Sequence, residues 1–201
     1  MYNFLLKIVG FYYKIFFRAK FYGIKNIPLT GGLLFCANHL SNNDPVIVAT
    51  HIPRKLGFMA KKELFKVPVI SSVVKWAGAF PVDRSTSDIR AVKVALTILK
   101  NGSPLMIFPE GRRNKKFAAN GIKPGAAVIA AKAEVPILPV YIKGKYKLFG
   151  KTEVYFGKPI SAEEVKAVVE KATEDAENKN KIIAQQLYDW IIGAEESGKL
   201  A

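Results

Sequence analysis

After Gly23 the sequence alternates between short apolar runs and longer segments with helical periodicity. Short apolar runs bounded by turn formers are typical of buried strands, and apolar residues at every third or fourth position are typical of helices packed on a sheet. The alternation predicts an α/β fold, with a central, mostly mixed sheet flanked by helices. Strands are expected at 33–37, 56–60, 79–82, 105–108, 137–142 and 153–156, and helices at 45–51, 69–77, 87–100, 126–132, 162–171 and 179–192.

Residues 2–18 precede this pattern and are rich in aromatic and aliphatic side chains. The residues of this segment that are neither aromatic nor aliphatic recur every three or four positions. On a helix they would fall within an arc of about 80°. These residues are Asn3, Lys7, Gly10, Lys14 and Arg18. A narrow, largely cationic stripe beside a wide apolar face is typical of an amphipathic helix that lies in a membrane interface.

We therefore expect residues 1–22 to form a membrane-associating helix ahead of a second unit, residues 23–201. Phe4, Phe11, Phe16 and Phe17 would lie at the acyl boundary, with the lysines toward the headgroups. The alternative is a first helix buried against the protein core.

The charge of the chain is unevenly distributed. The formal net charge is +15, and residues 1–125 carry 20 basic and 5 acidic side chains, whereas residues 126–201 carry 11 of each. A basic excess confined to one part of the chain indicates an anionic partner: nucleic acid, an anionic membrane or a phosphorylated substrate. Solubility alone is the alternative explanation.

Cysteine and histidine are scarce. Cys36 is the only cysteine, and His39 and His51 are the only histidines, so we expect neither an intrachain disulfide nor a metal site. The sequence has no stretch of 18 uncharged apolar residues, and its N-terminus lacks the features of a signal peptide. These features predict a peripheral or monotopic protein on the cytoplasmic side of the cell membrane.

His39 and Asp44 form the first candidate site. On a helix they would point about 140° apart, so they can meet only if residues 40–43 form a loop, which Ser and Asn favour. Asp44 precedes Pro45, the pattern of a helix N-cap followed by proline. A carboxylate there could bind one imidazole nitrogen and leave the other free to accept a proton from an alcohol. A capping aspartate beside an unrelated loop histidine is an equal alternative.

Asparagine caps a helix about as well as aspartate does. If Asp44 also acts through its charge, Asp44→Asn is therefore expected to keep stability and lose activity.

The segment Asn38–Asp44 (NHLSNND) resembles the NHx₄D motif of the glycerolipid acyltransferases, specifically the 1-acyl-sn-glycerol-3-phosphate acyltransferase family. Three further blocks follow in the family's order. Gly78–Arg84 (GAFPVDR) resembles the second block, Phe108–Asn114 (FPEGRRN) the FPEGTRS block, and Val135–Val140 (VPILPV) the VPIxPV block. Arg112 and Asn114 stand where the family usually has threonine and serine.

The resemblance implies that residues 23–201 form an acyltransferase domain of phospholipid biosynthesis. The enzyme would move a fatty acyl group from a thioester, acyl-CoA or acyl-ACP, to the 2-hydroxyl of lysophosphatidic acid, giving phosphatidic acid. His39 would take the hydroxyl proton, and Asp44 would orient and stabilise the imidazolium. No cofactor is implied beyond the thioester co-substrate.

The implied partners are lysophosphatidic acid, the carrier protein or coenzyme A thioester, and an anionic phospholipid surface, with no nucleic acid. Glycerol-3-phosphate or another lysolipid is the alternative acceptor. A non-catalytic basic protein that binds membranes or nucleic acid is a further alternative.

A lysophosphatidate headgroup needs cations, preferably arginine. Arg113, Arg84 and Lys61 follow the ends of expected strands, and strand ends of an open α/β sheet can converge on one crevice. We expect these three residues at the phosphate, in that order of importance. Gly111 would allow a sharp bend before Arg113. Glu110 would position Arg113 or a glycerol hydroxyl, unless it is merely a turn carboxylate.

Overall fold

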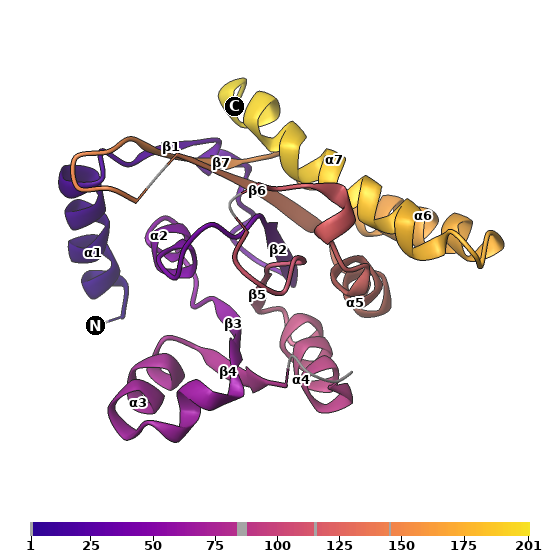
Figure 1. The fold of residues 1–201 in the computed structure, drawn as a ribbon, viewed down its shortest axis with the longest axis horizontal. Coiled ribbons are helices and arrows are strands. Elements are labelled where there is room, and N and C mark those ends of the chain that lie inside the picture. The colour runs from indigo at the N-terminus through magenta and orange to yellow at the C-terminus, as the bar shows by residue number, and fades with distance from the viewer. Residues whose placement is uncertain (1, 84–87, 115, 145) are drawn as a thin grey trace.

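The protein, in a computed structural model, forms a seven-stranded sheet with helices on both faces; the structure describes residues 2–83, 88–114, 116–144 and 146–201 (Figure 1). The strands are β1 (Lys20–Tyr22), β2 (Leu33–Ala37), β3 (Gly57–Lys61), β4 (Ala79–Val82), β5 (Pro104–Ile107), β6 (Ile137–Gly144) and β7 (Thr152–Phe156). The helices are α1 (Tyr2–Phe16), α2 (Asp44–Ala49), α3 (Pro68–Trp76), α4 (Ile89–Lys100), α5 (Gly125–Ala133), α6 (Ala162–Glu174) and α7 (Lys179–Lys199).

The strand order is β1-β7-β6-β2-β5-β3-β4. β6 and β7 are antiparallel, and every other neighbouring pair is parallel. The expected α/β class with a mixed sheet is thus confirmed. All the expected strands occur, and most expected ends lie within three residues of the observed ones. The main exception is α7, which continues to Lys199.

One strand was missed by sequence reasoning. β1 has three residues and pairs in parallel with β7, with Lys20 opposite Glu153 and Tyr22 opposite Tyr155. A strand this short shows too little alternation to be detected, and its pairing depends on a strand far away in the chain. Residues 1–22 therefore contribute an edge strand of the sheet as well as a helix.

The core consists of two layers, one on each face of the sheet. All of β2 is buried, and its side chains alternate between the layers. Leu33 and Phe35 pack with residues of α1 and α2, whereas Leu34 and Cys36 pack with residues of α4 to α7. Figure 1 shows α1 and α2 on one side of the sheet and α5 to α7 on the other. This continuous burial is why β2 appears in the sequence as an unbroken apolar run.

Five parallel strands end at one edge of the sheet, in the order β6, β2, β5, β3 and β4. Loops that follow adjacent parallel strands lie side by side, and ligand sites of α/β sheets form there. At this edge the side chain of Asn38 fastens the end of β2 to β6. Its Nδ2 donates to the carbonyl of Ile142 (2.9 Å), and its Oδ1 accepts from the Ile142 N–H (2.7 Å).

Helix α1 packs one side on the core and exposes another. Tyr13 is buried, and Leu6, Val9 and Phe17 pack against the same core layer. The exposed hydrophobic residues span an arc of about 140°. They are Phe4, Leu5, Ile8, Phe11, Tyr12, Ile15 and Phe16.

The expectation that Phe17 lies at the acyl boundary is wrong. Phe17 follows the last residue of α1, where the chain turns back toward β1, and its ring contacts those of Tyr13 and Tyr146 at centroid distances of 5.4 and 6.0 Å. Within the part of the chain that the structure describes, no helix is long and apolar enough to cross a membrane.

We expect Leu34→Ala to lower the free energy of unfolding by about 2–5 kcal/mol, because it opens a cavity in a fully buried position of β2. Urea denaturation would measure the loss. Leu29→Ala is the matched control, because Leu29 is 71% exposed and its truncation should change stability by less than about 0.5 kcal/mol. Equal unfolding midpoints for both variants would contradict this account of the core.

Candidate active site

The carboxylate of Asp44 is the centre of the loop after β2. Its Oδ2 accepts hydrogen bonds from Nδ1 of His39 (2.7 Å) and from the backbone N–H groups of Leu40 (2.6 Å) and Ser41 (2.7 Å). Its Oδ1 accepts from the hydroxyl of Tyr146 (2.7 Å). The side chain is fully buried, and burying a carboxylate costs free energy unless donors replace the lost water. Four donors do so here.

The expected position of Asp44 at the helix N-cap is wrong by one residue. The N-cap of α2 is Asn43, and Asp44 is the first helical residue, followed by Pro45. The backbone amides that Asp44 accepts from precede it in the loop, so its carboxylate folds the loop back onto His39. In the Asp44→Asn variant, the side-chain amide would place N–H groups against other donors. This substitution should therefore cost stability too, contrary to the expectation from sequence.

The ring of His39 is held in one orientation and one tautomer. It stacks on Phe108 with the ring centroids 4.1 Å apart and 20° between the planes. Its Nδ1 faces only the Asp44 carboxylate, so we assign the proton to Nδ1. Nε2 makes no hydrogen bond within the described residues, and 9% of the side chain remains exposed. Nε2 can therefore accept a proton from a hydroxyl group, the chemistry of a general base.

Glu110 joins the loop after β5 to the His39 loop. It is 4% exposed, its Oε2 accepts from the backbone N–H of His39 (2.9 Å), and its Oε1 accepts from Nδ2 of Asn114 (2.6 Å). The backbone N–H of Asn114 donates to the His39 carbonyl (2.9 Å). Asn114, which stands where serine is usual, thus supplies two of these three bonds. The structure gives Glu110 a positioning role for His39.

Arg113 lies on the same loop, directly before Asn114, and is exposed. Gly111 has φ of 65°, in the left-handed region, so the expected sharp bend before Arg113 is present. Lys123 also reaches this bend, with its Nζ 3.8 Å from the position of a Cβ on Gly111. Sequence reasoning gave Lys123 no role.

Lys61 belongs to a strand farther along the same edge. Lys61 is the last residue of β3, and its side chain is 58% exposed. Its Nζ lies 3.7 Å from Oε2 of Glu63. The order β2-β5-β3 puts Lys61 on the same edge as His39, two strands away. Arg84 lies outside the described residues. The structure therefore brings His39, Asp44, Glu110 and the Gly111–Arg113 bend together, and it leaves Lys61 more distant.

Two tyrosines that sequence reasoning missed adjoin Asp44. Tyr146, in the loop after β6, donates to Oδ1, and burial together with the Asp44 charge raises the pKa of its phenol. Tyr146 therefore stays protonated as a donor. Tyr13 of α1 has its pKa raised to about 12, first by burial, then by Tyr12 and by Asp44. Since 102 residues separate Tyr146 from Asp44, no local pattern could have revealed this contact.

Cys36 does not serve as a nucleophile here. It is fully buried in β2, and burial raises the pKa of its thiol to about 12, so the thiolate is not available near neutral pH. Among the described residues, no three His, Cys, Asp or Glu side chains come together in a group that could hold a metal ion.

A His–Asp pair at the carboxyl edge of a mixed α/β sheet defines a class of enzymes that activate a hydroxyl group. Comparison with known proteins identifies the family of the chain. A model of the family described as Acyltransferase matches residues 18–143. The chain is 32% identical over 148 residues to the 1-acyl-sn-glycerol-3-phosphate acyltransferase of Bacillus subtilis (strain 168), which covers 71% of this chain and 73% of that protein.

The corresponding protein of Streptococcus pneumoniae (strain ATCC BAA-255 / R6) is 32% identical over 178 residues, 85% of this chain and 66% of its own length. The crystal structure of the 1-acyl-sn-glycerophosphate (LPA) acyltransferase PlsC from Thermotoga maritima superposes with a TM-score of 0.71 and 25% identity, covering 96% of this chain and 78% of that one. The chain belongs to the acyltransferase family that contains these 1-acyl-sn-glycerol-3-phosphate acyltransferases. It spans just under two thirds of the pneumococcal relative.

We expect Tyr146→Phe to slow acyl transfer while leaving substrate binding largely intact, because one of the four donors to the buried Asp44 carboxylate is lost. Losing a hydrogen bond to a charged group costs about 1.5–3 kcal/mol of stability, and because the carboxylate is then held less firmly against His39, kcat should fall about tenfold. Steady-state kinetics on folded protein would measure kcat and KM separately. Tyr12→Phe, at an exposed position of α1, should leave both unchanged. Wild-type kcat in Tyr146→Phe would contradict the role of this bond.

Proposed function

We propose that the protein transfers a fatty acyl group from a thioester, acyl-CoA or acyl-ACP, to the 2-hydroxyl of lysophosphatidic acid, giving phosphatidic acid. The observation that supports this most is the 2.7 Å contact between His39 Nδ1 and the buried Asp44 carboxylate. It leaves Nε2 as a base at the edge where the exposed cations lie. The names of the family members support lysophosphatidic acid as the acceptor.

The reaction proceeds by direct transfer. Nε2 of His39 takes the proton of the acceptor hydroxyl as its oxygen attacks the thioester carbonyl carbon. The new C–O bond forms, the C–S bond breaks, and the leaving thiolate takes the proton from the His39 imidazolium. Asp44 stabilises that imidazolium through its bond to Nδ1. The lipid alcohol occupies the place that a serine has in hydrolases, so no acyl-enzyme is needed.

The phosphate of the acceptor is bound by cations at the same edge. Arg113 is the first of these, because the residue after it contacts the His39 carbonyl and because a guanidinium can bind two phosphate oxygens. Lys123 adds charge at the Gly111 bend. Lys61 lies farther along the edge, and Arg84 is retained from the sequence pattern as a phosphate ligand.

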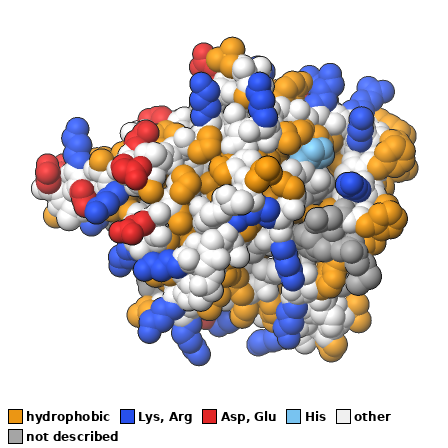
Figure 2. Space-filling model, turned by 180° about the vertical axis from the view of Figure 1, so that it is seen from behind, with side chains coloured by type: hydrophobic (Ala, Val, Ile, Leu, Met, Phe, Trp, Pro, Cys, Tyr) orange, Lys and Arg blue, Asp and Glu red, His pale blue; other side chains and the backbone are white. Residues whose placement is uncertain are grey.

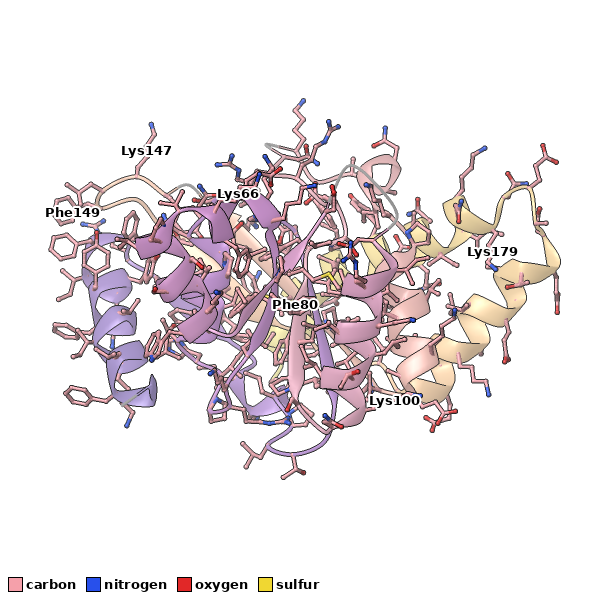
Figure 3. All side chains as sticks on the ribbon, turned by 90° about the horizontal axis from the view of Figure 1, so that it is seen from below. Lys66, Phe80, Lys100, Lys147, Phe149 and Lys179 are labelled. Atoms are coloured by element: carbon pink, nitrogen blue, oxygen red, sulfur yellow. The ribbon has the colours of Figure 1, made fainter. Side chains whose placement is uncertain are left out.

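The enzyme works at the cytoplasmic surface of an anionic membrane, held there by the exposed side of α1. This apolar surface continues onto the loop after β6, where Leu148 is 63% and Phe149 55% exposed. The rings of Phe16 and Phe149 have centroids 6.3 Å apart. Figure 3 shows Phe149 and Lys147 at one end of α1. The same loop carries Tyr146, which binds Asp44, so the membrane surface and the catalytic pair share one segment.

Replacing the base tests the activity directly. We expect His39→Ala to fold and to lower turnover by about 10²–10⁴-fold, the usual contribution of a general base. Ile182→Ala is the control, because Ile182 is a 39% exposed residue of α7, away from the loops that follow β2 and β5. Each acyl donor, acyl-CoA or acyl-ACP, is assayed with each of three acceptors: lysophosphatidate, glycerol-3-phosphate and a neutral lysolipid. The acyl chains of the lipids are short, so that every substrate is soluble. Near-normal turnover in His39→Ala would refute the general-base mechanism. A preference for another acceptor would refute the assignment of lysophosphatidic acid as the acceptor.

Membrane docking has a separate test. Phe4 and Phe11 are each 66% exposed, and burying a phenylalanine side chain gains about 1.5–3 kcal/mol. We expect Phe4→Ser/Phe11→Ser to lower binding to phospholipid vesicles at least about tenfold in a co-sedimentation assay. Leu29→Ser/Ile89→Ser is the matched control, with exposures of 71% and 68% away from α1. Equal binding by the two double variants would rule out α1 as the docking surface.

A further inference from the structure

A hollow lies on the surface away from the catalytic pair. It has a volume of about 690 Å³, is open to the surface, and is bordered by α1, β1 and the segment that follows α2. Its polar lining includes three lysines, and its apolar lining includes two aromatic rings and an aliphatic side chain. These are Lys7, Lys14, Lys20, Phe11, Phe21 and Ile24. The sequence placed Lys7 and Lys14 toward the lipid headgroups and gave Lys20 no role, and it did not indicate that the three border one hollow.

The lysines are not neutralised within the described part of the chain. No described Asp or Glu lines the hollow, and none of these three lysines lies within ion-pair distance of a described carboxylate. Lys7 and Lys14 are seven residues apart, so they project from nearly the same side of α1, about 10 Å apart along its axis. Ammonium groups at this spacing can approach one phosphate from two directions.

The histidine in the hollow adds no charge of its own. The hydroxyl of Thr50 donates to the Ile47 carbonyl (2.6 Å), so it accepts a hydrogen bond from Nδ1 of His51 (2.8 Å). The ring stacks on Phe21 with centroids 3.5 Å apart. Burial, and secondarily the charge of Lys14, lowers the pKa of His51 to about 4. His51 is therefore neutral at neutral pH, and the positive charge of the hollow comes from the lysines.

The lining combines cations with apolar surface, and this combination matches an amphiphile. Phe11 lines the hollow and also belongs to the exposed apolar side of α1, so the two surfaces meet. At about 100° per residue, the stripe of Lys7 and Lys14 lies directly beside that exposed side. Figure 2 shows Lys and Arg side chains gathered around a histidine and next to a hydrophobic surface. A free phosphate or an acidic peptide would not use the apolar part.

We propose that this hollow binds the phosphate headgroup of an anionic phospholipid in the membrane on which α1 docks. The proposal rests on the membrane docking proposed above, and it adds a lipid site distinct from the acyl-transfer site. The two sites lie at opposite ends of α2, a helix of six residues that spans about 9 Å. A lipid held there fixes the orientation of α2, and hence of Asp44, relative to the bilayer.

The experiment compares two vesicles of equal surface charge. One contains phosphatidylglycerol in phosphatidylcholine, and the other contains a succinylated diacylglycerol, which is anionic but has no phosphate. General electrostatic attraction is the same for both, so the ratio of the two partition coefficients reports headgroup recognition. We expect a ratio of about ten for the wild type, which corresponds to about 1.4 kcal/mol, and a ratio near one for Lys7→Gln/Lys14→Gln.

A second variant places a negative charge in the hollow without touching the lysines. Ile24→Glu should also reduce the ratio to near one, because Ile24 lines the hollow and is 42% exposed. Ile182→Glu is its control, on α7 with 39% exposure, and should keep the wild-type ratio. Lys100→Gln/Lys179→Gln is the control for the lysine pair, since Figure 3 shows both residues far from the end of α1 marked by Phe149.

A soluble probe separates this proposal from membrane docking. Monomeric dihexanoyl-phosphatidylglycerol should shift the NMR signals of Gly10, Thr50 and His51 in the wild type and not in Ile24→Glu. If the protein binds no vesicle but shows these shifts, the docking proposal fails and the headgroup site stands. A wild-type ratio of one, unchanged ratios in the variants, or no shifts with the soluble lipid would each overturn the headgroup site. Displacement of the soluble lipid by coenzyme A would assign the hollow to the acyl donor instead.

Discussion

The buried carboxylate of Asp44 is the interaction on which the geometry of the site depends. A lone carboxylate without water would be strongly unfavourable, so its burial requires that four donors from two segments be held in place at once. The loop after β2 provides three of them, and the loop after β6 provides the fourth. Satisfying the charge therefore fixes the tautomer of His39, the path of residues 40–43 and the position of Tyr146. Stability and catalytic competence of this edge are coupled for that reason.

The parts of this arrangement that follow local rules were accessible from the sequence. Leu33–Ala37 is an unbroken apolar run because it is buried on both faces, and this made β2 readable. The loop between His39 and Asp44 could be predicted from its turn-forming residue types and from Pro45. The bend at Gly111 could be predicted because glycine readily adopts the positive φ that such a bend needs. Each of these inferences needs only a few neighbouring residues.

The contacts that the sequence could not supply join distant segments. Glu110 lies 71 residues from His39, and its carboxylate could have faced a substrate, an arginine or a backbone amide with the same local sequence. The residues around Tyr146 are those of an ordinary loop, so they gave no indication of its hydrogen bond to Asp44. Asp44 was misplaced by one position because Asn43 and Asp44 are both plausible N-caps, and the choice depends on where four donors converge. In each case tertiary geometry, and not propensity, selected the partner.

Helix α1 shows why an apolar pattern alone left two alternatives open. The wide apolar face seen in the sequence is divided in the structure: Leu6, Val9 and Tyr13 pack on the core, whereas Phe4 and Phe11 remain exposed. The lysine stripe lies between these two sectors and borders the hollow that contains His51. One helix thus has three sides with three environments, and a pattern of polar and apolar residues cannot separate two apolar sides from each other. Part of the basic excess of residues 1–125 lies at two places, the edge that holds Arg113 and the hollow beside α1. Because α2 connects these two regions, an anionic surface that attracts one also constrains the orientation of the other.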